Sequence, residues 1–183
     1  DEKLFLQLIT KKTQKTLTIT IEEHSKKDEE SRKKAPYKCN ILHYACQNPN
    51  PEMLEDLFKI KACKEFLNEP DSEGNTPLFY AIMSQKDEHL PAIIDVLIKN
   101  KPFLKFKTDY IEHRNKEGFT PWLLAVKLGK LKAANCLSDR NKHKANVLCE
   151  NNIGENGVHL IVEHLECWNG NSGIVKYIPQ KEV

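Results

Sequence analysis

Cysteine and histidine are the residues of this chain that could take part in nucleophilic or metal chemistry. Cys39 and His43 are four positions apart, so one helical turn could bring a thiol close to an imidazole that would activate it. Pairs at this spacing arise easily by chance, and the sequence contains no hydrolase elbow, phosphate-binding loop, zinc-protease or dinucleotide-binding motif. We therefore expect no catalytic residues, no small-molecule substrate and no enzyme activity.

A second group of such residues consists of His159, His164 and Cys167, with Cys149 upstream. Zinc sites usually combine four ligands in closely paired spacings, which this group lacks. The chain has 6 cysteines and none forms a C-x-x-C pair, a pattern typical of buried, reduced thiols in a cytoplasmic protein. We expect neither a metal site nor another cofactor.

The composition limits the remaining function classes. Of the 183 residues, 39% are hydrophobic and 30% are charged, which favours a folded core over disorder. A net charge of +2 with only three arginines argues against nucleic-acid binding, which needs a concentrated basic surface. No run of about 18 apolar residues is present, so we expect no membrane span. The chain begins at Asp1 rather than Met, which suggests a piece of a longer protein.

A short pattern recurs along the chain and predicts its architecture. In the two clearest copies, a glycine is followed two residues later by Thr-Pro and an apolar stretch. Threonine caps a helix by accepting from a first-turn amide, proline fits the next position, and glycine suits the tight turn before them. Helices are therefore expected to begin at equivalent positions spaced 36, 44 and 36 residues apart, namely Asn40, Thr76, Thr120 and Asn156.

A second helix follows each of these starts, because apolar residues again recur at helical spacing. One helix pair cannot bury its own apolar face, so several pairs must stack. Leu78 and Trp122 are expected in the shared core. The predicted second helices are Pro51 to Ile60, Leu90 to Asn100, Lys130 to Ser138 and Ile174 to Ile178.

The copies resemble the ankyrin repeat, whose opening pattern is D-x-x-G-x-T-P-L-H-x-A and whose common period is about 33 residues. The resemblance implies an all-α ankyrin-repeat solenoid of stacked helix-turn-helix units with finger loops. It also implies that His43 and His159 are structural, bonding within and between repeats. The matching residues are Leu42, His43 and Ala45 in the first copy, Asp71, Gly74, Thr76, Pro77, Leu78 and Ala81 in the second, Asn115 (in place of Asp), Gly118, Thr120, Pro121 and Ala125 in the third, and Gly154 and His159 in the fourth.

The repeats are expected to span residues 38–178, divided at about 38–70, 71–114, 115–151 and a degenerate 152–178, with a tail at 179–183. Residues 1–37 form an extension, a cap or the end of a preceding domain. Leu17, Ile19 and Ile21 alternate with threonines there, which predicts a strand. Two segments lengthen the connections, Gln85 to His89 and Lys105 to Arg114. Such insertions either form part of a binding face or are tolerated surface drift.

The resemblance places a partner-binding site on the concave surface and the finger loops. The position after the repeat histidine would form an aromatic and aliphatic stripe, although packing against neighbouring repeats is an equal alternative. The stripe consists of Tyr44, Tyr80, Leu124 and Leu160, and the finger residues are Asp71, Glu73, Asn75, Asn115, Lys116, Glu117 and Phe119.

The predicted function is recognition of a protein or peptide partner. The lysine- and asparagine-rich, divergent repeats favour a bacterial effector that acts in the cytoplasm of a host cell. The alternatives are the substrate-docking part of a larger enzyme, and the cytosolic ankyrin domain of a scaffold or channel.

Overall fold

The computed structural model describes residues 18–21, 37–100, 110–139 and 141–163. The strand predicted in the N-terminal segment corresponds to the first described range, residues 18–21. The predicted helix Ile174 to Ile178 and the group His164 and Cys167 lie outside the described residues. The elements are β1 Thr18–Ile21, β2 Tyr37–Asn40, α2 Ile41–Ala45, α3 Pro51–Lys59, α4 Lys61–Glu65, the 3-10 helix η2 Phe66–Asn68, α5 Pro77–Ser84, α6 Leu90–Lys99, α7 Pro121–Lys127, α8 Leu131–Ser138 and α9 Gly157–Glu163.

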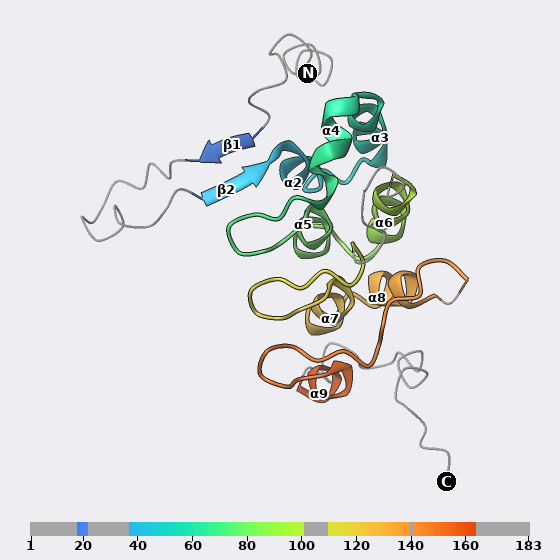
Figure 1. Cartoon of the computed structure of the whole chain (residues 1–183). Helices are drawn as coiled ribbons and strands as arrows, with labels where there is room; N and C mark the ends of the chain where they lie inside the picture. The colour runs from blue at the N-terminus through green and yellow to red at the C-terminus, as the bar shows by residue number, and fades with distance from the viewer. Residues whose placement is uncertain (1–17, 22–36, 101–109, 140, 164–183) are drawn as a thin grey trace, which may run out of the picture.

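The helices are arranged in two columns (Figure 1). The inner column contains α2, α5, α7 and α9, each packed on the next, and the outer column contains α3, α6 and α8. Long loops lead into α5, α7 and α9 and project to the same side of the stack. This arrangement confirms the predicted solenoid of helix-turn-helix units with finger loops. None of the helices that the structure describes is long and apolar enough to cross a membrane.

The inner helices begin where the repeated pattern predicts. Asn40 caps α2 by accepting from the amides of Leu42 and His43, and Thr120 caps α7 by accepting from that of Leu123. Thr76 occupies the equivalent position before α5, but its side chain makes no capping bond. The start of α5 is instead marked by proline at its first position, where no amide hydrogen is needed.

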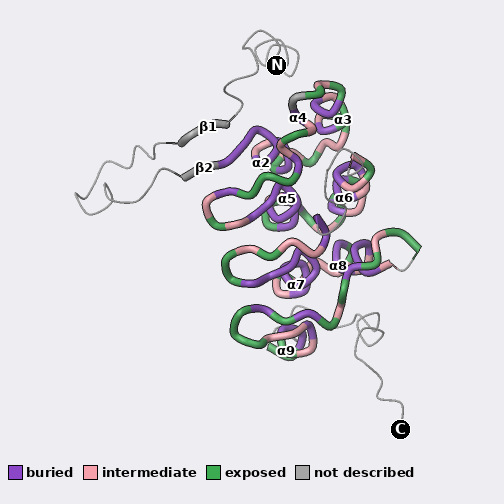
Figure 2. The backbone as a smooth tube through the Cα atoms, viewed as in Figure 1, coloured by how far each residue is buried: buried purple, intermediate pink, exposed green. Residues whose placement is uncertain are grey.

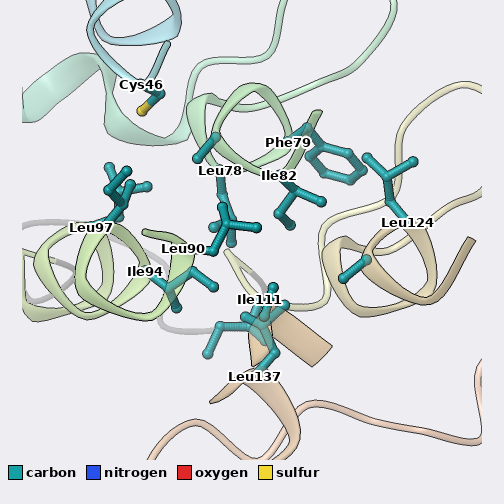
Figure 3. Close-up of a cluster of buried hydrophobic side chains, with 14 of the residues drawn as sticks. Cys46, Leu78, Phe79, Ile82, Leu90, Ile94, Leu97, Ile111, Leu124 and Leu137 are labelled. Carbon is teal, nitrogen blue, oxygen red and sulfur yellow. The ribbon is translucent and has the colours of Figure 1, made fainter. Parts of the chain in front are cut away.

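The core lies between the two columns and runs through every described repeat. Leu78 and Trp122 are buried within it, as predicted, with exposed fractions of 0% and 1%. Apolar side chains of α5 and α6 meet there, and Ile111 of the same repeat and Leu137 of the next one close the cluster (Figure 3). No repeat has a core of its own, so each depends on its neighbours for stability.

The predicted strand of the N-terminal segment is β1, which pairs antiparallel with β2. Thr18 lies opposite Asn40, and Ile21 lies opposite Tyr37. Because Asn40 also caps α2, the hairpin leads directly into the first inner helix.

Both lengthened connections contain buried or bonded residues with a structural role. Tyr110 and Ile111, from the longer one, are 1% and 6% exposed and belong to the core. In the shorter one, the buried Gln85 donates from Nε2 to the carbonyl oxygen of Cys46 over 2.9 Å. Asp87 accepts from the amides of the first turn of α8, in the next repeat. Burial excludes Gln85, Tyr110 and Ile111 as partner contacts. Lys86, Glu88, His89 and Arg114 are exposed, so a binding role for the rest of these two segments stays a prediction.

Candidate partner-binding surface

The fingers before α5, α7 and α9 share one turn. Its first residue, Asp71, Asn115 or Asn151, accepts with side-chain Oδ1 from the amides two and four residues later. The fourth residue of each turn is a glycine with φ between 80° and 83°. That conformation strains any residue with a side chain, so glycine is favoured there. The turns therefore have a defined shape that does not depend on a partner.

Neighbouring fingers are hydrogen-bonded to one another through backbone atoms. The amide of Lys116 donates to the carbonyl oxygen of Glu73 over 3.0 Å, and the amide of Asn152 donates to that of Glu117 over 3.1 Å. The side chain of Asn152 also donates to the carbonyl oxygen of Lys116. The fingers thus form a continuous row, and the side chains of Glu73, Lys116 and Glu117 take no part in the bonds that hold it.

The tips of this row are exposed, and the segments that return from them to α5 and α7 are buried, whereas the one that returns to α9 is exposed or half-buried (Figure 2). Glu73, Lys116 and Glu117, all predicted finger residues, are exposed there. The tip therefore carries charges of both signs. Charges of this kind steer association and select partners more than they add affinity.

The two tyrosines of the predicted stripe are partly exposed and fixed in place. The hydroxyl of Tyr80 donates to Oδ2 of Asp71 over 2.9 Å, and its ring packs edge-on against His43 with centroids 4.7 Å apart. The hydroxyl of Tyr44 accepts from the thiol of Cys39 over 3.3 Å. Rigid aromatic rings with an open edge lose little entropy when a partner packs on them.

The two leucines of the predicted stripe are buried, so their prediction as partner contacts is wrong. Leu124 and Leu160 are 9% and 0% exposed. Leu124 points toward Phe79, between α5 and α7 (Figure 3). Leu160 lies on α9, which packs on α7. A leucine at this position is short enough for the adjoining helix to cover it, whereas tyrosine extends further.

Asp71, Asn75 and Phe119 were predicted as finger contacts and are also buried, with exposed fractions of 6%, 9% and 3%. Asp71 shapes its own turn, and the ring of Phe119 lies under Lys127, whose Nζ is 4.5 Å from the ring centroid. Asn115 is half-buried and donates to the side-chain oxygen of Asn75. These residues build the fingers and do not present themselves to a partner.

Exposed apolar residues were missed from the sequence. Ile153 is 79% exposed and occupies, in the fourth finger, the position that Glu73 and Glu117 occupy in the others. Met83 of α5 and Leu128, which ends α7, are 43% and 41% exposed. The spacing from Asn151 could have located Ile153, because the turn pattern of the fourth finger is intact.

The structure explains why His43 is not a catalytic base. Its Nδ1 accepts from the amide of Asn40 over 3.0 Å, and its Nε2 bonds with the carbonyl oxygen of Asn75 over 2.9 Å. Both ring nitrogens are therefore engaged, which confirms the predicted structural role. His159 repeats the first of these bonds, since its Nδ1 accepts from the amide of Asn156.

The buried thiols of Cys46, Cys63 and Cys149 are poor nucleophiles. Burial raises the pKa of Cys46, Cys63 and Cys149, so these thiols stay protonated at neutral pH. The deduction agrees with the sequence expectation of cysteine as a small core residue.

The stacked helix pairs, the capped inner helices and the row of fingers together define a helical repeat solenoid. The sequence matches the family described as ankyrin repeats (3 copies) over residues 6–105 and 42–182. The chain belongs to the ankyrin repeat family. Ankyrin repeats are generally protein-protein interaction modules and are typically not enzymes. A comparison with curated proteins found no match.

Proposed function

We propose that this chain binds a partner protein through the finger tips together with the exposed edge of the inner helices. One observation supports this most strongly: backbone bonds join the fingers into one row, and the exposed side chains of Glu73, Lys116 and Glu117 take no part in those bonds. Such a surface is suited to recognition. Its backbone is already held in place, so binding a partner costs little conformational entropy.

The proposed surface has a definite chemistry. Glu73, Lys116 and Glu117 are exposed at the finger tips, and the apolar residues Met83 and Leu128 are exposed at the C-terminal ends of α5 and α7. A partner that fits would present charges of both signs around an apolar centre. Apolar contacts would supply most of the affinity, and the tips would supply selectivity and association rate.

The experiment uses a charge-reversed triple variant, Glu73→Lys, Lys116→Glu and Glu117→Lys. The finger bonds use backbone atoms of these residues, so the variant is expected to fold normally. The native chain and the variant are used to capture partners from a eukaryotic cell lysate, and captured proteins are identified by mass spectrometry. We expect at least one partner that the native chain retains and the variant loses.

A matched control reverses three charges away from the fingers: Glu55→Lys, Glu65→Lys and Lys99→Glu. These residues lie on α3, α4 and α6, are exposed, and give the same change in net charge. Retention of the partner by the control and its loss from the finger variant would support the proposal. Equal retention by both variants would exclude the finger tips as the site.

The proposed compartment is the cytoplasm. Cys46, Cys63 and Cys149 belong to the apolar core as free thiols, a use of cysteine that reducing compartments favour. The chain could also act in the cytoplasm of a host cell as a delivered bacterial effector. In that case the capture experiment would yield a eukaryotic partner protein.

A further inference from the structure

Three potential metal ligands from two adjoining repeats meet on the outer column, away from the fingers. They are Asp95 of α6, Cys136 of α8, and His143 in the loop after α8. Their ligand atoms all lie within 4.8 Å of one another. Nε2 of His143 is 2.9 Å from Oδ1 of Asp95, and Sγ of Cys136 is 3.9 Å from the same oxygen.

Packing of α6 against α8 brings Asp95 and Cys136 together. Cys136 is 9% exposed, and its Sγ lies near the carboxylate of Asp95 on the facing helix. The carboxylate of Asp95 is 46% exposed, which leaves the cluster open to solvent on one side. An ion could therefore reach the cluster without unfolding the repeat.

A tight turn directs His143 back to Asp95. The carbonyl oxygen of Asp139 accepts from the amides of Lys142, His143 and Lys144, and Oδ1 of Asp139 accepts from that of Asn141. Lys144 has φ of 60°, which is unusual for a residue with a side chain. The strained residue follows His143 directly, and the side chain of His143 is only 9% exposed. Strain of this kind is found where a side chain must be held in one place.

The three atoms match the ligands of a zinc-class cation. Thiolate sulfur, imidazole nitrogen and carboxylate oxygen bind Zn²⁺ at about 2.0–2.3 Å, which puts tetrahedral ligand atoms roughly 3.3–3.6 Å apart. The measured separations bracket that range. Lys142 bonds to Oδ2 of Asp95, so Oδ1 is left facing the other two groups.

The protonation states of the cluster are also compatible with metal binding. Burial raises the pKa of Asp95, but hydrogen bonds from His143 and Lys142 outweigh it and lower the pKa below its usual value, so the carboxylate is charged. Burial and the nearby carboxylate raise the pKa of Cys136 to about 11. The thiol therefore keeps its proton until a cation displaces it, and that proton leaves to solvent. Nε2 of His143 must also give up the proton that it shares with Asp95, so the neutral ring carries its proton on Nδ1 when Nε2 binds the cation.

An inter-repeat ion pair between His143 and Asp95 would account for two of these residues. It does not account for a thiol beside the same oxygen, nor for the turn that brings a third group there. We propose that Asp95, Cys136 and His143 form a site for a single divalent cation of the zinc class, with the fourth coordination position open. The sequence spacing gives no sign of this cluster, because its members are 41 and 7 positions apart.

The test adds Co²⁺ to the purified, reduced 183-residue chain and records its absorption spectrum. Cobalt bound to a thiolate in a tetrahedral site gives a near-ultraviolet charge-transfer band and strong visible bands. We expect both at one equivalent of Co²⁺, and their loss when Zn²⁺ is added. Zn²⁺ is also expected to raise the thermal unfolding midpoint of the native chain, since it binds only the folded site.

Cys136→Ser is the decisive variant, and Cys149→Ser is its matched control because Cys149 is a comparably buried thiol outside the cluster. We expect Cys136→Ser to lose the charge-transfer band and Cys149→Ser to keep it, with circular dichroism confirming that both fold. His143→Gln is expected to weaken Co²⁺ binding at least tenfold. A native chain without the band, or a band that Cys136→Ser retains, would overturn the proposal.

Discussion

His43 bonds with the carbonyl oxygen of Asn75 across 2.9 Å and thereby joins the first inner helix to the base of the next finger. The same ring accepts from the amide of Asn40. A ring that accepts at Nδ1 must carry its proton on Nε2 and be neutral in order to make both bonds. Burial accordingly lowers the pKa of His43 below 6.5.

This bond makes stability depend on pH. Above pH 6.5, His43 is neutral in both the folded and unfolded chain. Between 6.5 and its lower folded-state pKa, the unfolded chain binds the additional proton, so the free energy of unfolding falls as the pH falls. We expect urea unfolding to show that, between about pH 7.5 and pH 5.5, the free energy of unfolding falls more for the native chain than for His43→Gln. Parallel curves for the two chains would contradict the assignment.

Replacing Gly118 with a residue that has a side chain should lower the stability of the chain more than the same replacement at Gly154. Both have a positive φ, so alanine costs about 1–2 kcal/mol of conformational strain at either position. A Cβ at Gly118 would also lie 2.5 Å from the amide nitrogen of Asn152, whereas a Cβ at Gly154 meets nothing within 4 Å. Gly118→Ala is therefore expected to lose about 1–3 kcal/mol more than Gly154→Ala in chemical unfolding. Equal losses would show that the fingers are not in close contact.

The shared core should respond strongly to truncation. Leu78 is fully buried between repeats, so Leu78→Ala is expected to lower the free energy of unfolding by about 2–5 kcal/mol. Met83 lies on the same helix but is 43% exposed. Met83→Ala should therefore change the free energy of unfolding by no more than about 0.5 kcal/mol. Urea midpoints that shift equally would place Leu78 outside the core.

Asp87 caps a helix of the next repeat and should contribute measurably to the free energy of unfolding. Asp87 accepts from the amides of Lys132 and Ala133 at the start of α8. Asp87→Ala is expected to cost about 0.5–2 kcal/mol, as loss of other helix caps does. Asp56→Ala removes only an exposed ion pair with Lys59 and should cost less than about 1 kcal/mol. Thermal unfolding of both variants measures the difference, and a smaller loss for Asp87→Ala would rule out the cap.

Local sequence chemistry predicted the elements well but could not predict which side chains remain exposed. Thr120 and Pro121 start a helix because capping and proline geometry act within a few residues. Asp87 was not recognised, because its amide partners belong to a repeat 45 residues away. Tyr80 and Leu124 hold the same repeat position, yet only the longer side chain extends beyond the adjoining helix. Exposure depends on neighbours that the pattern of one repeat does not describe.

The most direct test of partner binding by the fingers is hydrogen–deuterium exchange, measured on the native chain alone and bound to a captured partner. We predict slower exchange on binding in residues 71–75, 115–119 and 151–155, with no change in α3 and α6. Exchange that slows only in α3 and α6, with the fingers unchanged, would contradict the account and place the partner on the outer column.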